Sequence, residues 1–174
     1  MIGPLTCIDR PCTRGFTRQG IEQRGPPVND ERAVQEVLAR YVRETDRRDG
    51  AAQGALFTDD AVVQIFARAG EGYEKMGEPL IGGAGVQYAV ENFMGPHPEG
   101  GTSHHVTTDH IIDVDGDSAH LNAQYVMFEI RTTPEPSIRP AESGYYDTDL
   151  RRIDGVWKIV RHHVLGDLPL GARP

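Results

Sequence analysis

Residues 103–131 read SHHVTTDHIIDVDGDSAHLNAQYVMFEIR, and this stretch decides the fold class. Two runs rich in β-branched and aromatic residues, 103–114 and 118–131, flank the dipeptide Asp115-Gly116. An Asp-Gly pair between two such runs is typical of a tight β-hairpin, because both residue types tolerate the positive φ that the turn requires. The stretch therefore predicts two long antiparallel strands.

A second Asp-Gly pair, Asp154-Gly155, predicts another hairpin between residues 144–153 and 156–165. Strand alternation places Trp157 and Ile159 on one face of its second strand. By the same alternation, Val160 and Val164 are expected on the other face. A proline-rich loop over residues 133–141 is expected to join the two hairpins.

Helical patterns precede these strands. Asn29 or Asp30 can cap a first helix, which Gly50 is expected to close. Its buried face is predicted from residues that recur at helical spacing: Val34, Val37, Leu38, Tyr41, Val42 and Thr45. Further along the chain we expect a short helix over 51–57, a strand over 61–66, a glycine-rich stretch over 70–85 and a helix over 86–93. Helices first and antiparallel strands afterwards predict an α+β domain.

Length and charge limit the function classes. With 174 residues the chain has the size of one compact domain, which we expect over residues 29–165. Residues 1–28, which end in Gly25-Pro26-Pro27, are expected to form a flexible extension, and residues 166–174 a tail. The formal net charge of −8 argues against binding to nucleic acid and to anionic membrane surfaces.

The chain is expected to be cytoplasmic. No apolar run approaches the roughly 20 residues that span a bilayer, and residues 1–20 lack the apolar core of a secretory signal. The two cysteines, Cys7 and Cys12, both lie in the extension, so they cannot form a disulfide framework across a core.

The order of these elements resembles the nuclear transport factor 2-like superfamily, and specifically its SnoaL-like branch. The resemblance rests on four stretches in matching order: Tyr41-x4-Asp46-x2-Asp49, LFTDDAV at 56–62, His105 ahead of IDVDGDSA at 112–119, and DGVWKI at 154–159. It implies a cone-shaped α+β roll of the cystatin-like kind, in which a strongly curved antiparallel sheet wraps around the N-terminal helices and encloses an apolar pocket.

The resemblance also implies site residues. Scytalone dehydratase, bile acid dehydratase and hexachlorocyclohexane dehydrochlorinase use an Asp-His pair to remove a proton during an elimination. Asp46 and His105 match that pair, and Tyr41 matches the tyrosine of the bile acid enzyme. A pocket residue of the last strand would be Arg161 or His162, with the register left open. Two aromatic residues, Phe57 and Tyr125, are expected in the core and the pocket wall.

These residue types suit proton removal from carbon. A free imidazole has a pKa of ~6.5, near operating pH. For His105 to present one bare nitrogen to a substrate, its other nitrogen must donate to an acceptor, and Asp46 would be that acceptor. Tyr41 could donate its hydroxyl to the oxygen that accumulates charge. This chemistry needs no cofactor, and the expected substrate is a small, largely apolar or polycyclic molecule.

Helical spacing alone does not select Asp46. At about 100° per residue, Asp46 lies roughly 110° from the centre of the apolar stripe, whereas Asp49 lies roughly 50° from it. Asp49 is therefore the competing acid. Tyr41 lies on the stripe itself, as a core tyrosine would.

Strand alternation leaves the histidine open as well. His105 shares one strand parity with Ile111, whereas the apolar residues Val106, Ile112 and Val114 share the other. His104 is therefore its rival for the inner face.

No metal site is expected. Six histidines lie in the strand regions: His104, His105, His110, His120, His162 and His163. Adjacent histidines on a regular strand point to opposite faces and cannot chelate one ion, and the sequence contains no His-Glu-x-x-His motif.

The sequence thus favours a cofactor-independent lyase or isomerase, with dehydratase-like chemistry. One alternative is a non-catalytic ligand-binding or assembly module of the same fold, which predicts no His-Asp contact. Another is a polyketide cyclase or epoxide hydrolase, which would need a second acid such as Asp49 facing the cavity. The resemblance further implies a homo-oligomer, a trimer or a dimer, associated through the outer face of the sheet.

Overall fold

The computed structural model describes residues 29–169; the extension predicted over residues 1–28 lies outside them, as does most of the tail. The helices are α1 (Asp30–Arg47), α2 (Gly50–Gly54) and α3 (Gly82–Phe93). The strands are β1 (Phe57–Ala69), β2 (Gly72–Ile81), β3 (Gly101–Asp115), β4 (Ser118–Arg131), β5 (Ser137–Ile153) and β6 (Val156–Gly166).

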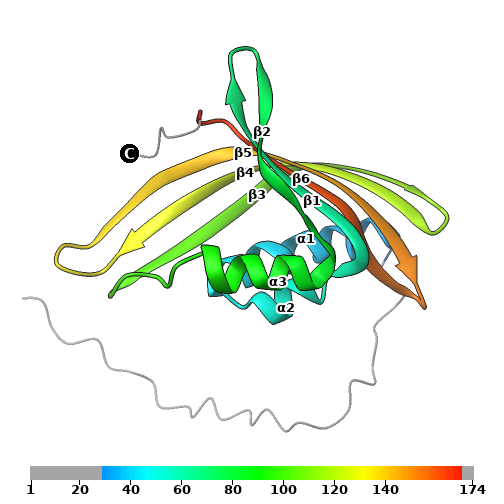
Figure 1. The fold of residues 1–174 in the computed structure, drawn as a ribbon, viewed down its shortest axis with the longest axis horizontal. Helices are drawn as coiled ribbons and strands as arrows, with labels where there is room; N and C mark the ends of the chain where they lie inside the picture. Colours follow the sequence, from blue (N-terminus) through cyan, green and yellow to red (C-terminus); the bar gives the residue numbers. More distant parts are fainter. Residues whose placement is uncertain (1–28, 170–174) are drawn as a thin grey trace, which may run out of the picture.

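The strands form one mixed sheet in the order β2-β1-β6-β5-β4-β3. Neighbours pair antiparallel, except β1 and β6, which run parallel. Figure 1 shows the sheet arching over the three helices, which lie under its concave side. The predicted α+β architecture, with a curved sheet around N-terminal helices, is confirmed.

Helix α1 supplies the centre of the core. All six residues predicted for its apolar face are buried, because the 3.6-residue period holds along the whole helix. Asn29 caps its start, where its side-chain oxygen accepts a hydrogen bond from the Arg32 amide at 2.9 Å. The predicted end at Gly50 is wrong: the helix ends at Arg47, and Arg48 adopts the left-handed conformation at φ 60°.

The short elements after α1 differ from their predicted bounds. Helix α2 begins at Gly50 and ends at Gly54, so Phe57 belongs to β1 instead of the helix. Strand β2 was not predicted, because it lies at the edge of the sheet and its mostly exposed residues show no apolar alternation. Helix α3 starts at Gly82, four residues before the predicted Val86.

The predicted proline-rich loop is shorter than expected, since β5 already begins at Ser137. Pro140 pairs with Phe128 of β4, next to a register shift. Strand β5 pairs with β6 only from Gly144 onward. No residue of β6 therefore lies opposite Pro140, where it would need the backbone amide hydrogen that proline lacks.

A β-bulge in β3 sets which face His105 occupies. Thr108 pairs with Gln124 and Ile111 with Asn122, so β3 has one residue more than β4 between these pairs. Asp109 at the bulge has a positive φ of 52°. The bulge reverses the strand parity, so His105 shares the inner face with Ile112 and Val114, while Val106 and Ile111 are exposed on the outer face.

A second bulge settles the register of β6. Arg161 pairs with Asp149 but Ile159 pairs with Leu150, which leaves Val160 as the extra residue. His162 therefore follows Trp157 and Ile159 onto the buried face. The prediction that Val164 faces the other side is wrong, since Val164 packs against the core.

The core lies between the inner face of the sheet and the helices. It joins the apolar face of α1 and Val86 of α3 to inward residues of the central strands. Those strand residues include Leu121, Tyr146 and Ile159. Within residues 29–169, no helix is long and apolar enough to cross a membrane.

The bulge at Asp109 generates a stability prediction. A β-branched side chain strongly disfavours positive φ, so Asp109→Val is expected to lower the free energy of unfolding by about 1–2 kcal/mol, whereas Asp109→Gly is expected to be neutral or stabilising. Asp113→Val is the matched control, because Asp113 is an exposed residue of the same strand without positive φ. Urea titration measures all three variants. Equal losses for both valine variants would contradict the account of the bulge.

Candidate active site

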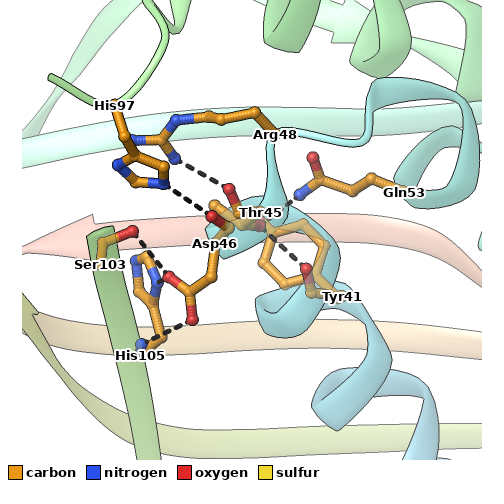
Figure 2. Close-up of polar contacts among 8 residues, drawn as sticks. All are labelled: Tyr41, Thr45, Asp46, Arg48, Gln53, His97, Ser103 and His105. Atoms are coloured by element: carbon orange, nitrogen blue, oxygen red, sulfur yellow. Dashed lines mark hydrogen bonds and ion pairs between the residues drawn. The ribbon is translucent and has the colours of Figure 1, made fainter. Parts of the chain in front are cut away.

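Asp46 and His105 meet where the last turn of α1 packs beside β3. Asp46 Oδ1 lies 2.7 Å from His105 Nδ1. Figure 2 shows the two side chains pointing toward each other. Both side chains are mostly buried but still reachable, with exposed fractions of 14% for Asp46 and 11% for His105. The helix and the sheet thus bring together the two residues that the resemblance implied as a pair.

Two further hydrogen bonds hold the Asp46 carboxylate. Ser103 Oγ donates to Oδ1 at 2.9 Å, and the backbone N–H of His105 donates to Oδ2 at 2.9 Å. Burial alone would raise the pKa of Asp46, but the hydrogen bonds from His105 and Ser103 outweigh it and lower the pKa. Asp46 is therefore ionised at neutral pH.

The ionised carboxylate determines the tautomer of the imidazole. A carboxylate can only accept hydrogen bonds, so Nδ1 of His105 must carry the hydrogen that points at Asp46. Nε2 of the neutral ring is then the bare nitrogen. This is the state that a general base requires.

The last turn of α1 is itself braced. His97 Nε2 donates to the backbone carbonyl of Asp46 at 2.7 Å, and Arg48 donates to the carbonyl of Thr45 at 2.8 Å. Gln53 Nε2 donates to Thr45 Oγ1 at 2.6 Å. Figure 2 shows these contacts around Asp46. Carbonyls that a helix end would leave without partners are thus satisfied by side chains.

Tyr41 lies in an aromatic cluster on the inner face. Its ring makes edge contacts with its neighbours, at centroid distances of 4.4 Å to His162, 5.7 Å to Tyr146 and 6.0 Å to Phe57. Tyr125 stacks on Tyr146 at 4.5 Å. Among the described residues, Tyr41 makes no hydrogen bond to Asp46 or His105. Burial, with the Glu142 carboxylate as a lesser cause, raises its pKa and keeps the hydroxyl protonated.

His162 is completely buried at the centre of this cluster. Its Nδ1 lies 2.8 Å from Thr148 Oγ1, while its Nε2 has no hydrogen-bond partner within residues 29–169. Burial, helped by the neighbouring His163 and Arg161, lowers the pKa of His162 to about 3. The ring is therefore neutral at physiological pH.

The sequence left Arg161 and His162 as alternatives for the pocket residue of β6. Arg161 does not line the inner face, so that alternative is wrong. Its guanidinium pairs with Asp147 at 2.6 Å and with Asp149 at 2.5 Å. It also lies 2.9 Å from His163 Nδ1. As the neighbour of the buried His162, Arg161 points to the outer face of the sheet.

The competing residues have other positions. Asp49 is exposed, and its carboxylate caps α2 by accepting from the Ala52 amide at 2.9 Å. Because α1 has already ended at Arg47, the helical wheel does not apply to Asp49. His104 is exposed on the outer face. Within residues 29–169, no group of three or more potential metal ligands converges.

Several residues of the site were not singled out from the sequence, among them Ser103, Tyr146 and His97. Ser103 had a usable signal, because it precedes His105 by two positions and must share its strand face. Tyr146 had a weaker one, as an aromatic residue in a predicted strand. His97 had none, since it lies between Pro96 and Pro98 in a loop whose path the sequence does not specify.

Comparison with known proteins identifies the type of domain. A family model described as a SnoaL-like domain matches residues 26–163. No curated protein gives a match.

Several solved structures are similar in fold. The β subunit of a putative aromatic-ring-hydroxylating dioxygenase from Novosphingobium aromaticivorans has 20% identity and a TM-score of 0.64, covering 79% of this chain and 88% of that one. ActVI-ORFA from Streptomyces coelicolor has 18% identity and a TM-score of 0.62, covering 78% and 96%. Rv3472, of unknown function, from Mycobacterium tuberculosis has 21% identity and a TM-score of 0.60, covering 78% and 70%. At these identities the likeness concerns the fold alone.

The buried His162 predicts a specific pH dependence of stability. Below about pH 6.5 the unfolded chain binds a proton at this histidine, whereas the folded protein does so only near pH 3. The free energy of unfolding should therefore fall by about 1.4 kcal/mol per pH unit between pH 6 and pH 4 through this residue. Urea titrations of His162→Gln should show a pH slope that is shallower by that amount.

His104→Gln is the matched control for this measurement, because it removes an exposed histidine and should leave the slope unchanged. If His162→Gln and wild type lose stability in parallel, His162 is not the buried neutral histidine described here.

Proposed function

The chain belongs to the SnoaL-like domain family, and we propose that it is a cofactor-independent enzyme of lyase or isomerase type. Its substrate is a small, largely apolar molecule from which His105 removes a proton bound to carbon. The observation that carries the proposal is the 2.7 Å contact between Asp46 and His105, which in a neutral ring puts the hydrogen on Nδ1 and leaves Nε2 to accept a proton.

In the proposed step the substrate C–H bond breaks and its proton moves to His105 Nε2. The electron pair stays on the substrate, as an enolate where the carbon lies next to a carbonyl. Asp46 stabilises the imidazolium that forms, because its carboxylate is already ionised and held by Ser103. A lyase then expels a leaving group, whereas an isomerase returns the proton to another carbon.

Tyr41 is assigned to the developing oxyanion as a supporting donor, since its raised pKa keeps its proton available for a hydrogen bond. The apolar character of the substrate is supported by the neighbouring rings of Phe57, Tyr125 and His162. These rings belong to the wall and make no proton transfer in the proposal.

The alternatives have less support. A purely ligand-binding module has no need of a buried carboxylate that orients an imidazole, yet Asp46 accepts three hydrogen bonds for that geometry. A cyclase or hydrolase that relies on Asp49 lacks its acid, because Asp49 is exposed and caps α2.

Self-association is part of the proposal. Apolar residues stand exposed on the outer face of the sheet, among them Val106, Ile111 and Tyr145. A homo-oligomer that covers this face would bury them, and their exposure supports a dimer or a trimer.

The proposal predicts that the protein catalyses exchange of carbon-bound hydrogen. In D₂O, with 1-tetralone and related bicyclic ketones as probes, proton NMR should show deuterium entering the position next to the carbonyl. His105→Asn and Asp46→Asn should each lower the exchange rate at least ~100-fold while the protein stays folded. Asp49→Asn is the control and should retain the rate. Exchange no faster than in buffer, or unaffected by His105→Asn, would refute the proposed function.

A further inference from the structure

A second acid lies in the same row of the sheet as His105. His105 pairs with Met127 of β4, and Met127 pairs with Glu142 of β5. Residues paired in register point to the same face, so all three lie on the inner face. Adjacent strands are about 4.8 Å apart, which places the backbones of His105 and Glu142 about 10 Å from each other.

This row is reachable from solvent. Met127, Glu142 and the mostly buried His105 each keep part of their surface exposed. An apolar molecule lying across Met127 would therefore have the imidazole of His105 at one end and the carboxylate of Glu142 at the other.

Tyr125 holds the Glu142 carboxylate in a fixed orientation. The Tyr125 hydroxyl donates to Glu142 Oε1 at 2.8 Å. Its ring reaches that position across Gly144, where even a methyl side chain would come within 3.0 Å of the ring. Stacking on Tyr146, at 4.5 Å with an interplanar angle of 16°, fixes the ring itself. Glu142 therefore meets a ligand with a preset geometry, which reduces the entropy lost on binding.

The charge of Glu142 also acts on the whole aromatic cluster. Burial is the main cause that raises the pKa values of Tyr41, Tyr125 and Tyr146, and the Glu142 carboxylate raises all three further. Asp46 is another carboxyl group on the same face. Carboxylate oxygens beside apolar rings accept hydrogen bonds, so this face favours a neutral hydrogen-bond donor over an anionic ligand.

We propose that Glu142 determines substrate specificity by accepting a hydrogen bond from a hydroxyl group of the substrate. The substrate class is then a neutral, hydroxylated, apolar ring compound, whose reacting C–H faces His105 while its hydroxyl faces Glu142. Tyr125 is a positioning residue for this carboxylate. The inference rests on the proposed function, because it uses His105 to define the reacting end.

Calorimetric titration of three naphthalene probes at pH 7 tests the specificity. Wild type should bind 2-naphthol at least ~10-fold more tightly than 2-methoxynaphthalene, which has no donor, and than 2-naphthoate, which carries a negative charge. Glu142→Gln should reduce both preferences at least ~5-fold, since the neutral amide accepts more weakly and repels no anion. Tyr125→Phe should weaken the preference for 2-naphthol and leave the affinity for 2-methoxynaphthalene unchanged.

Two controls separate this inference from the proposed function. Glu74→Gln makes the same chemical change at an exposed residue of β2 and should behave as wild type. His105→Asn should abolish hydrogen exchange yet keep the preference for 2-naphthol, because that preference depends on Glu142. Equal affinities for the three probes, no binding of any of them, or an unchanged preference in Glu142→Gln would overturn the assignment.

Discussion

The contact between an acid on α1 and an imidazole on β3 joins the two layers of this fold at the candidate site. Asp46 accepts hydrogen bonds from the side chain and the backbone of His105 and from Ser103, so one carboxylate ties the end of the helix to the edge strand of the sheet. Losing these three hydrogen bonds would leave a mostly buried charge unsatisfied, which is far more costly than losing a surface ion pair. The same contact makes His105 a potential base, because it determines which ring nitrogen carries the hydrogen.

Sheet irregularities bring the functional side chains to the inner face. The bulge at Asp109 turns His105 inward, and the bulge at Val160 turns His162 inward and Arg161 outward. A regular strand would have given the opposite parity on one side of each bulge. The apolar rings around Tyr41 and the acids at Asp46 and Glu142 thus share one face, which gives it both an apolar surface and directed polar groups, as small-molecule sites have.

Much of the fold could be predicted from the sequence, and the reasons differ by element. The buried face of α1 was correct in every residue, because burial there follows a single period from Val34 to Thr45. The hairpins at Asp115-Gly116 and Asp154-Gly155 were correct because the turn dipeptide carries its own conformational signal. Strand β2 and the bulges were missed, because an exposed edge strand has no apolar pattern and a bulge depends on the partner strand.

For the site, helical spacing favoured Asp49 over Asp46, since it measures only distance from the apolar stripe, whereas Asp46 faces the polar atoms of Ser103 and His105. The resemblance to a known superfamily pointed to Asp46 and His105, while Ser103 and His97 became visible only through their contacts.

The tautomer of His105 is the most direct test of the central claim. Long-range proton–nitrogen correlation NMR of the protein with ¹⁵N-labelled histidine reports the state of each ring nitrogen. At pH 8, where a free imidazole is neutral, we expect Nδ1 of His105 to be protonated and Nε2 to be bare in the wild type, and Asp46→Asn to lose this preference. A hydrogen on Nε2 in the wild type, or the same tautomer in both proteins, would contradict this claim.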